Sequence, residues 1–335
     1  MSTFGNLATA ATLAAFSVVS AHAIVVTGPI ANSADVTYGT PVGNVNLSGV
    51  VAVQSSIGGC SGTLLSDGLS ILTAGHCVTP AYGTAPVTDA TVYFTGPSGL
   101  VSRAVSSVTV NPGWSGDASQ GGDLAVLLLS TPAPAFASGY DLYTGDPAFN
   151  SPLILAGYGL NGTGDTGASV PNSYGKLRAG ENEYAGTGAS IFNWSASLLI
   201  GQFYDSSNSD TNALGLLNPF AAVDEVDIAH GDSGGPSFYN GQIIGVHDVI
   251  ICKDDSDHSA CATPPSVSAS NNSYFGQLFG DTSVSAYTTW ISAQEVVFTP
   301  EPATLWILAG GLCLIALDFR RRKSQSSAKA IPQKL

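Results

Sequence analysis

A serine, a histidine and an aspartate in this sequence are the residue types that acyl transfer requires. Ser233 stands in residues 230–236 (HGDSGGP), His76 stands in residues 72–77 (LTAGHC), and Asp123 lies between the two in the chain. A serine hydroxyl is a weak nucleophile at neutral pH, so an imidazole must take its proton and a carboxylate must hold that imidazole in the correct tautomer. We therefore predict that Ser233 is a nucleophile, His76 its general base and Asp123 the acid that orients the base.

The glycines on both sides of Ser233 predict a sharply bent backbone. Glycine adopts left-handed conformations that other residues avoid, so such a bend can direct two neighbouring amides at one point. The amides of Gly231 and Ser233 are suited to stabilise a developing oxyanion in this way. We predict that they form an oxyanion hole.

Taken together, these segments resemble the trypsin-like (chymotrypsin-fold) serine proteases, in which TAxHC, Asp-Leu-Ala before an apolar strand, and GDSGGP occur in this order. The resemblance runs from about residue 50 to residue 297 and includes residues 59–65, 155–159 and 282–291. It implies an all-β fold of two six-stranded antiparallel β-barrels with a short C-terminal helix. It also implies an endopeptidase that acts on protein or peptide substrates, with the roles given above for His76, Asp123, Ser233 and Gly231, and without a cofactor or a metal.

Composition favours the same fold class. The 335 residues include 39 Gly and 18 Pro, and only 10% are charged, which is typical of short strands and turns. Apolar runs that predict strands lie at residues 49–53, 87–95, 104–110, 124–129, 152–156 and 242–251. One helix is predicted near the end of this region, where Val284, Tyr287, Trp290 and Ile291 recur at helical spacing.

The first 23 residues predict a signal peptide. An apolar stretch at residues 7–19 is followed by Ala21-His22-Ala23, a small-x-small pattern that signal peptidase accepts. Cleavage there leaves Ile24 as the first residue of a protease domain that we place at residues 24–297. No Lys or Arg precedes the apolar stretch, which departs from the usual pattern; the alternative is a core helix, which we favour less.

The C-terminus predicts a sorting signal at residues 298–323. Residues 300–302 (PEP) precede an apolar run at residues 303–317 and four basic residues at 320–323, a layout that resembles the PEP-CTERM signal of Gram-negative bacteria. The resemblance implies a sorting enzyme of the exosortase type as a partner.

It also implies export to the cell surface or extracellular matrix, with the protein either anchored or released. We predict a transmembrane helix at residues 303–319 and a basic cytoplasmic tail at residues 324–335. The 15 apolar residues span only ~22 Å of a ~30 Å hydrocarbon core, so local thinning must help. The alternative is a buried terminal helix of the domain.

The cysteines point to an oxidising compartment. Cys60 and Cys77 stand where the resembled family has a disulfide beside its catalytic histidine. Cys252 and Cys261 are close enough in sequence to form a second bridge, or else they are two free thiols in an acidic loop.

Charge excludes two classes of partner. Residues 24–302 contain four basic and 23 acidic residues, a formal net charge of −19, which argues against binding to nucleic acid or to anionic membrane surfaces. The acidic stretches at residues 205–210 and 254–257 lack the spacing of a calcium-binding loop, and we interpret both as solvated loops.

Substrate preference depends on Asp227, six residues before Ser233. In the resembled family that position lies at the base of the pocket for the substrate side chain, and a carboxylate there favours Arg or Lys. Two features oppose this interpretation: residues 224–227 form an acidic cluster that can face solvent, and Ala229 replaces a cysteine that commonly braces the pocket. His247 and Asp248, in the strand after the nucleophile, can line the same cleft, but we interpret them as structural and assign them no catalytic role.

Activation follows from the same resemblance. In that family a newly freed Ile or Val ammonium inserts and pairs with the aspartate before the nucleophile, here Asp232. Signal cleavage would expose Ile24, so export itself would switch the enzyme on. The alternative is a propeptide that ends before residue 50.

Two rival functions remain open. Residues 231–235 also match G-x-S-x-G, but an α/β-hydrolase esterase needs the chain order serine, acid, histidine and alternating helices, neither of which this sequence offers. The other rival is a catalytically silent, surface-displayed binding module on a protease scaffold.

Overall fold

The computed structural model describes residues 24–28, 35–80, 85–170, 172–215, 225–251 and 273–296. The described residues up to Glu295 belong to one compact unit. The predicted signal peptide, the sorting signal with its transmembrane helix at residues 303–319, and the basic tail lie outside the described residues. No helix of the described part is long and apolar enough to cross a membrane.

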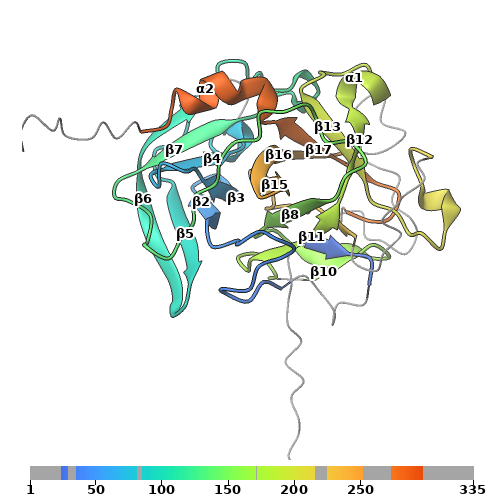
Figure 1. Ribbon diagram of the computed structural model, residues 1–335, viewed down its shortest axis with the longest axis horizontal. Helices are drawn as coiled ribbons and strands as arrows, with labels where there is room; N and C mark the ends of the chain where they lie inside the picture. Colours follow the sequence, from blue (N-terminus) through green and yellow to red (C-terminus); the bar gives the residue numbers. More distant parts are fainter. Residues whose placement is uncertain are drawn as a thin grey trace, which may run out of the picture. The chain divides into compact units, whose positions relative to one another are not determined.

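Six strands of the N-terminal half close into an antiparallel barrel (Figure 1). They are β2 Val50–Ser55, β3 Gly58–Leu64, β4 Ser70–Thr73, β5 Thr91–Gly96, β6 Gly99–Val110 and β7 Ala125–Leu129. The ring closes because β2 pairs with both β3 and β5. β-Branched and aromatic side chains such as Val51, Ile71 and Phe94 fill its interior, and all three are fully buried.

The C-terminal half forms a seven-stranded sheet in the order β11-β8-β15-β16-β17-β13-β12. These strands are β8 Leu153–Gly157, β11 Arg178–Asn182, β12 Tyr184–Thr187, β13 Leu198–Gln202, β15 Pro236–Tyr239, β16 Gln242–Ile251 and β17 Leu278–Ser283. The predicted second six-stranded barrel is therefore wrong in detail, because the sheet is a half-barrel. One strand is interrupted at Glu183, whose amide donates to Asn182 Oδ1 (2.6 Å) instead of to a ladder partner, and its two pieces lie at opposite edges of the sheet.

A smaller four-stranded sheet holds the first described residues. It has the order β10-β9-β1-β14, with β1 Ile24–Val26, β9 Asn161–Thr163, β10 Gly167–Val170 and β14 Val226–Asp227. β1 is parallel to β9 and antiparallel to β14, so it has a hydrogen-bonded neighbour on each side.

Helices are few and short. They are α1 Gly188–Ile191 and α2 Thr288–Ser292, with 3-10 turns η2 Gly75–Cys77, η3 Ala118–Gln120, η4 Ser209–Thr211 and η5 Ser285–Tyr287. The all-β prediction is confirmed, the predicted strand at residues 242–251 coincides with β16, and the predicted terminal helix corresponds to η5 and α2.

Candidate active site

His76 and Asp123 form the tightest polar pair of the candidate site. His76 lies in η2, directly after β4, and Asp123 lies just before β7, the strand that pairs with β4. Asp123 Oδ1 accepts from the His76 amide (2.8 Å), and Asp123 Oδ2 lies 2.5 Å from His76 Nδ1. The ladder between β4 and β7 thus brings together two residues that are distant in sequence.

The pair has the charge distribution of a base and its orienting acid. Burial lowers the pKa of His76, but the adjacent Asp123 carboxylate outweighs it, so the pKa is raised. Burial acts to raise the pKa of Asp123, but the charge and hydrogen bonds of His76 outweigh it, and this pKa is lowered. Asp123 is fully buried, whereas 35% of the His76 side chain is exposed and accessible to a substrate.

The small size of Gly75 makes this approach feasible. A Cβ at Gly75 would stand 2.9 Å from both Asp123 Oδ1 and the Trp114 ring. Any larger residue would push the acid or the indole away from His76.

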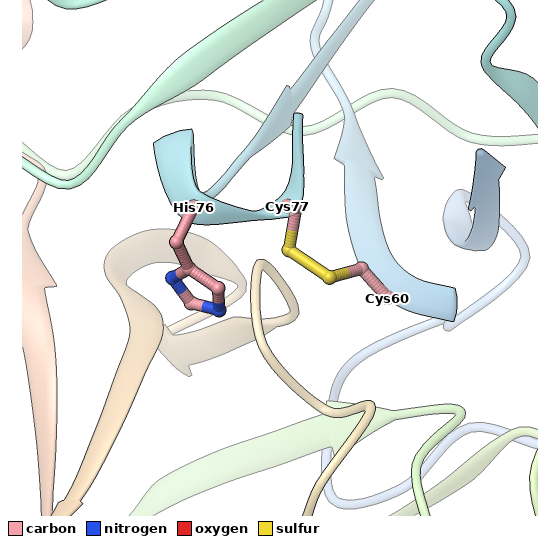
Figure 2. Close-up of side chains that lie close together, drawn as sticks. All are labelled: Cys60, His76 and Cys77. Carbon is pink, nitrogen blue, oxygen red and sulfur yellow. A yellow bond between two sulfur atoms is a disulfide. The ribbon is translucent and has the colours of Figure 1, made fainter. Parts of the chain in front are cut away.

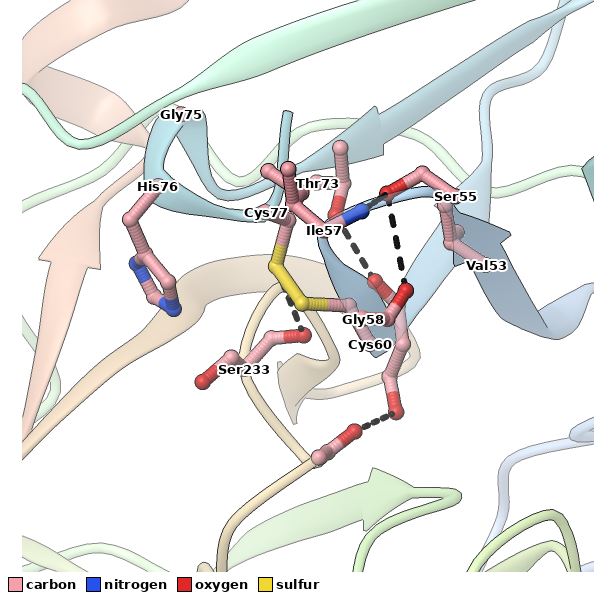
Figure 3. Close-up of a disulfide and its surroundings, with 12 residues drawn as sticks. Val53, Ser55, Ile57, Gly58, Cys60, Thr73, Gly75, His76, Cys77 and Ser233 are labelled. Carbon is pink, nitrogen blue, oxygen red and sulfur yellow. Dashed lines mark hydrogen bonds between the residues drawn. A yellow bond between two sulfur atoms is a disulfide. The ribbon is translucent and has the colours of Figure 1, made fainter. Parts of the chain in front are cut away.

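Ser233 stands in a tight turn between β14 and β15. Its carbonyl oxygen accepts from the Ser61 amide (2.8 Å) and contacts Cys77 Sγ. Figure 3 shows Ser233 next to the imidazole of His76. The structure therefore brings Ser233, His76 and Asp123 together, although they come from three distant segments.

Glycines and the backbone of β16 fix the turn that carries Ser233. The Gly234 amide donates to the His247 carbonyl (2.8 Å), and the His247 amide donates to the Gly235 carbonyl (2.9 Å). Gly234 has φ +81°, and a Cβ there would stand 2.1 Å from Thr73 Oγ1, so only glycine fits.

The amides predicted as an oxyanion hole flank this turn. Gly231 has φ +97°. Within the described ranges, no acceptor is bonded to the amides of Gly231 or Ser233, whereas the intervening Asp232 amide donates to the Ala229 carbonyl (2.9 Å). Two unpaired donors beside a candidate nucleophile are what stabilisation of an oxyanion requires; their role stays a prediction.

The predicted disulfide between Cys60 and Cys77 is confirmed, with a Cα–Cα distance of 6.0 Å. It joins β3 to η2 and lies beside His76 (Figure 2). The other predicted pair, Cys252 and Cys261, lies outside the described residues.

Removing this bridge should destabilise the protein and loosen His76. The bridge closes a loop with a sequence separation of 17 residues, for which chain entropy gives about 3 kcal/mol. We expect the double variant Cys60→Ala/Cys77→Ala to lose about this much free energy of unfolding in urea titrations. Reduction of the native protein should reproduce the loss, and an unchanged urea midpoint after full reduction would contradict the expectation.

Asp227, predicted at the base of a substrate pocket, is completely buried in β14. Its Oδ1 accepts from the Ile228 amide (2.9 Å), and its Oδ2 has no partner in the described part of the chain. Burial raises its pKa well above the ordinary value, and the negative charges of Asp232 and Asp281 add to this. The charged form of this carboxyl is therefore disfavoured where it stands.

Asp232 and Ile24, which are predicted to pair, are both fully buried. Asp232 Oδ1 accepts from the Gly159 amide and Oδ2 from the Ala229 amide, both at 2.8 Å. Burial raises the pKa of Asp232 to about 6 although these hydrogen bonds oppose the rise. Ile24 is fully buried in β1, and its φ of +63° is unusual for a β-branched residue. No ion pair joins Ile24 to Asp232 among the described residues.

A third buried acid, Glu225, precedes Asp227 and Asp232 in the chain. Glu225 is 7% exposed, and burial, with the charges of Asp227 and Glu183, raises its pKa from 4.5 to about 9. The protonated form therefore predominates in the folded state at neutral pH.

This acid should make stability fall as pH rises. Between pH 4.5 and pH 9 the folded state holds a proton on Glu225 that the unfolded state releases, so the stabilisation is complete below this window and is lost through it. We expect Glu225→Gln to raise Tm by roughly 5 °C at pH 8 and to leave it unchanged at pH 4, as measured by thermal unfolding. The exposed Glu181→Gln is the control; equal Tm values at pH 8 would count against the prediction.

Sequence reasoning assigned no catalytic role to Asp248, which the structure places at the site. Its carboxyl lies against the Asp123 carboxyl, in a group with His76 whose nitrogen and oxygen atoms are all within 4.8 Å of one another. The neighbouring His247 instead faces the half-barrel, where its Nδ1 lies 3.0 Å from Asp281 Oδ1. His247 and Asp248 are thus neighbours in one strand that contact different partners. Apart from the two residue types, nothing in the sequence indicates which of them lies at the site.

The chain is similar to known proteins in sequence and in fold. Residues 38–270 match the family model described as Trypsin. Among solved structures, neuropsin, a serine protease expressed in the limbic system of mouse brain, superposes with a TM-score of 0.54 at 15% identity, covering 78% of this chain and 97% of that one. At this identity the likeness concerns the fold alone. No curated protein matches the chain in sequence.

Proposed function

Because this chain belongs to the trypsin family of serine proteases, we propose that it is a serine endopeptidase that acts through an acyl-enzyme on Ser233. The observation that carries the proposal is the bonded pair of His76 and Asp123 next to Ser233. Ser233 Oγ attacks the scissile carbonyl while His76 Nε2 takes its proton and later gives it to the leaving amine. Asp123 keeps the proton of the imidazole on Nδ1, and the amides of Gly231 and Ser233 bind the oxyanion.

Hydrolysis of a peptide library by the full chain tests this function. We expect cleavage products, together with covalent labelling of Ser233 by a fluorophosphonate probe located by mass spectrometry. Neither cleavage nor labelling of a folded sample that begins at Ile24 would reject the proposal.

For specificity, the proposed preference for Arg or Lys rests on Asp227. Burial disfavours the charged form of this carboxyl, so a guanidinium or ammonium group must approach for it to ionise, because a cation nearby favours the charged form. In the same library, cleavage after Arg or Lys that Asp227→Asn abolishes would support this role. Cleavage after other residues would discard it and keep the catalytic proposal.

The second candidate function, a catalytically silent binding module, is favoured by one observation. Asp227 has no exposed surface, which is what a blocked substrate pocket would produce. Binding of peptides without hydrolysis, unaffected by Ser233→Ala, would favour this candidate.

Activation and location are proposed from the sequence. Removal of residues 1–23 would free the Ile24 ammonium to pair with Asp232, whose two oxygens have only backbone amides as hydrogen-bond donors in the described part of the chain. Residues 298–323 would direct the protein to a sorting enzyme of the exosortase type and, through residues 303–319, to the membrane or the cell surface. Mass spectrometry of the mature N-terminus tests the first step, since a start downstream of Ile24 would exclude it.

A further inference from the structure

Asp248 lies behind Asp123, the candidate orienting acid, because of a β-bulge in β16. His247 pairs with Asp281 and Val249 pairs with Gly280, so Asp248 is an extra residue without a partner in β17. A bulge of this kind redirects a side chain. Asp248 consequently leaves the half-barrel and reaches Asp123, which belongs to the first barrel.

The contacts of Asp248 decide which of the two carboxyls carries a proton. The two carboxyls are buried and within 4.8 Å of each other, and a carboxylate only accepts hydrogen bonds, so a hydrogen bond between them requires a proton on one of the two. Asp123 already accepts from the amide and lies 2.5 Å from the Nδ1 of His76, both of which favour its ionised form. Asp248 is 8% exposed, and its Oδ2 accepts only from the Thr282 hydroxyl (3.0 Å).

The charges around Asp248 lead to the same assignment. It faces Asp123 and His76 from the first barrel and Asp281 from β17, and its strand neighbour His247 is engaged with Asp281. Burial, followed by the negative charge of Asp123, raises the pKa of Asp248 well above its ordinary value, whereas the pKa of Asp123 is lowered.

We propose that Asp248 is a positioning residue that, as a neutral carboxylic acid, donates a hydrogen bond to the Asp123 carboxylate and holds it in the orientation that His76 requires. This role rests on the proposed function of the same site. During acyl transfer the imidazolium of His76 faces Asp123, and the donor behind Asp123 prevents the carboxylate from rotating and spreads its negative charge. Asp248 itself touches neither substrate nor His76 in this mechanism.

Two variants of Asp248 separate a neutral donor from a charge. In Asp248→Asn an amide nitrogen donates to Asp123 while the amide oxygen accepts from Thr282, so kcat should stay within about threefold of the native value. In Asp248→Leu the shape is similar but the donor is lost, and kcat should fall by about tenfold or more with little change in KM. In Asp248→Leu the acid limb of the pH profile of kcat/KM should also move by about half a unit to higher pH. Without a hydrogen-bond donor behind it, the Asp123 carboxylate carries its full negative charge and favours the imidazolium form of His76.

A readout without substrate keeps this test separate from the proposed activity. The low-field proton resonance of His76 Nδ1 in the full chain reports the titration of the imidazole even if no peptide is cleaved. Asp248→Asn should titrate as the native protein does, and the control Glu183→Gln, a buried acid outside the site, should leave both readouts unchanged.

Either of two results would overturn the proposal. A downward shift of the His76 titration in Asp248→Asn would mean that a negative charge had been removed, so Asp248 would be ionised. Native kcat and an unmoved acid limb in Asp248→Leu would mean that the hydrogen bond positions nothing. If Asp248→Leu does not fold, the Asp248→Asn titration alone decides.

Discussion

Ser233→Ala should lower kcat for peptide hydrolysis by about a millionfold, the size of effect found when a nucleophilic serine of this kind is removed. Without the Oγ no acyl-enzyme forms, and His76 loses the proton that it would transfer. The turn around Ser233 is held by the backbone bonds of Gly234 and Gly235, so the variant should fold normally. Steady-state hydrolysis with circular dichroism as a check of folding provides the measurement.

A matched control for this variant is Ser106→Ala, an exposed serine on β6. It should hydrolyse peptides at the native rate. If Ser233→Ala keeps more than about one per cent of the native kcat, the nucleophile lies elsewhere.

Asp123→Asn should lower kcat by about 10⁴-fold, the size known for the same change in other triad proteases. The asparagine oxygen would accept from the His76 amide, and its nitrogen would donate to Nδ1. That arrangement forces the imidazole proton onto Nε2. A protonated Nε2 cannot accept the proton of Ser233. The measurement is kcat across pH, since the loss should shrink at alkaline pH if hydroxide replaces the base.

Asp146→Asn, a change of an exposed acid, serves as the control for this variant. It should leave kcat unaltered. A loss of less than about tenfold in Asp123→Asn would contradict the assigned role of Asp123.

Sequence analysis predicts features that depend on residues adjacent in the chain, such as a turn that only glycine can form. Ser233 is surrounded by glycines that the turn requires, as the 2.1 Å approach at Gly234 illustrates. β16 is mostly apolar, and the structure reproduces its predicted bounds.

Features that depend on distant pairing could not be predicted. The bulge at Asp248 depends on the register between β16 and β17, which nothing in the sequence around His247 specifies. Asp227 stands in an acidic stretch that can face solvent, yet it is fully buried in β14, where it pairs with Val25 of β1. The bond from the Glu183 amide to the Asn182 side chain, which separates β11 from β12, likewise has no signal in the sequence.

The position of β1 between β9 and β14 means that its sheet is completed late in folding. Val26 pairs with Val226, about 200 residues later, so β1 cannot gain its second neighbour until most of the chain is available. Contacts of such long range form slowly, because the loop entropy is lost before the contact is gained. Completion of the four-stranded sheet buries Ile24, so the proposed cleavage before Ile24 would have to precede this late step of folding.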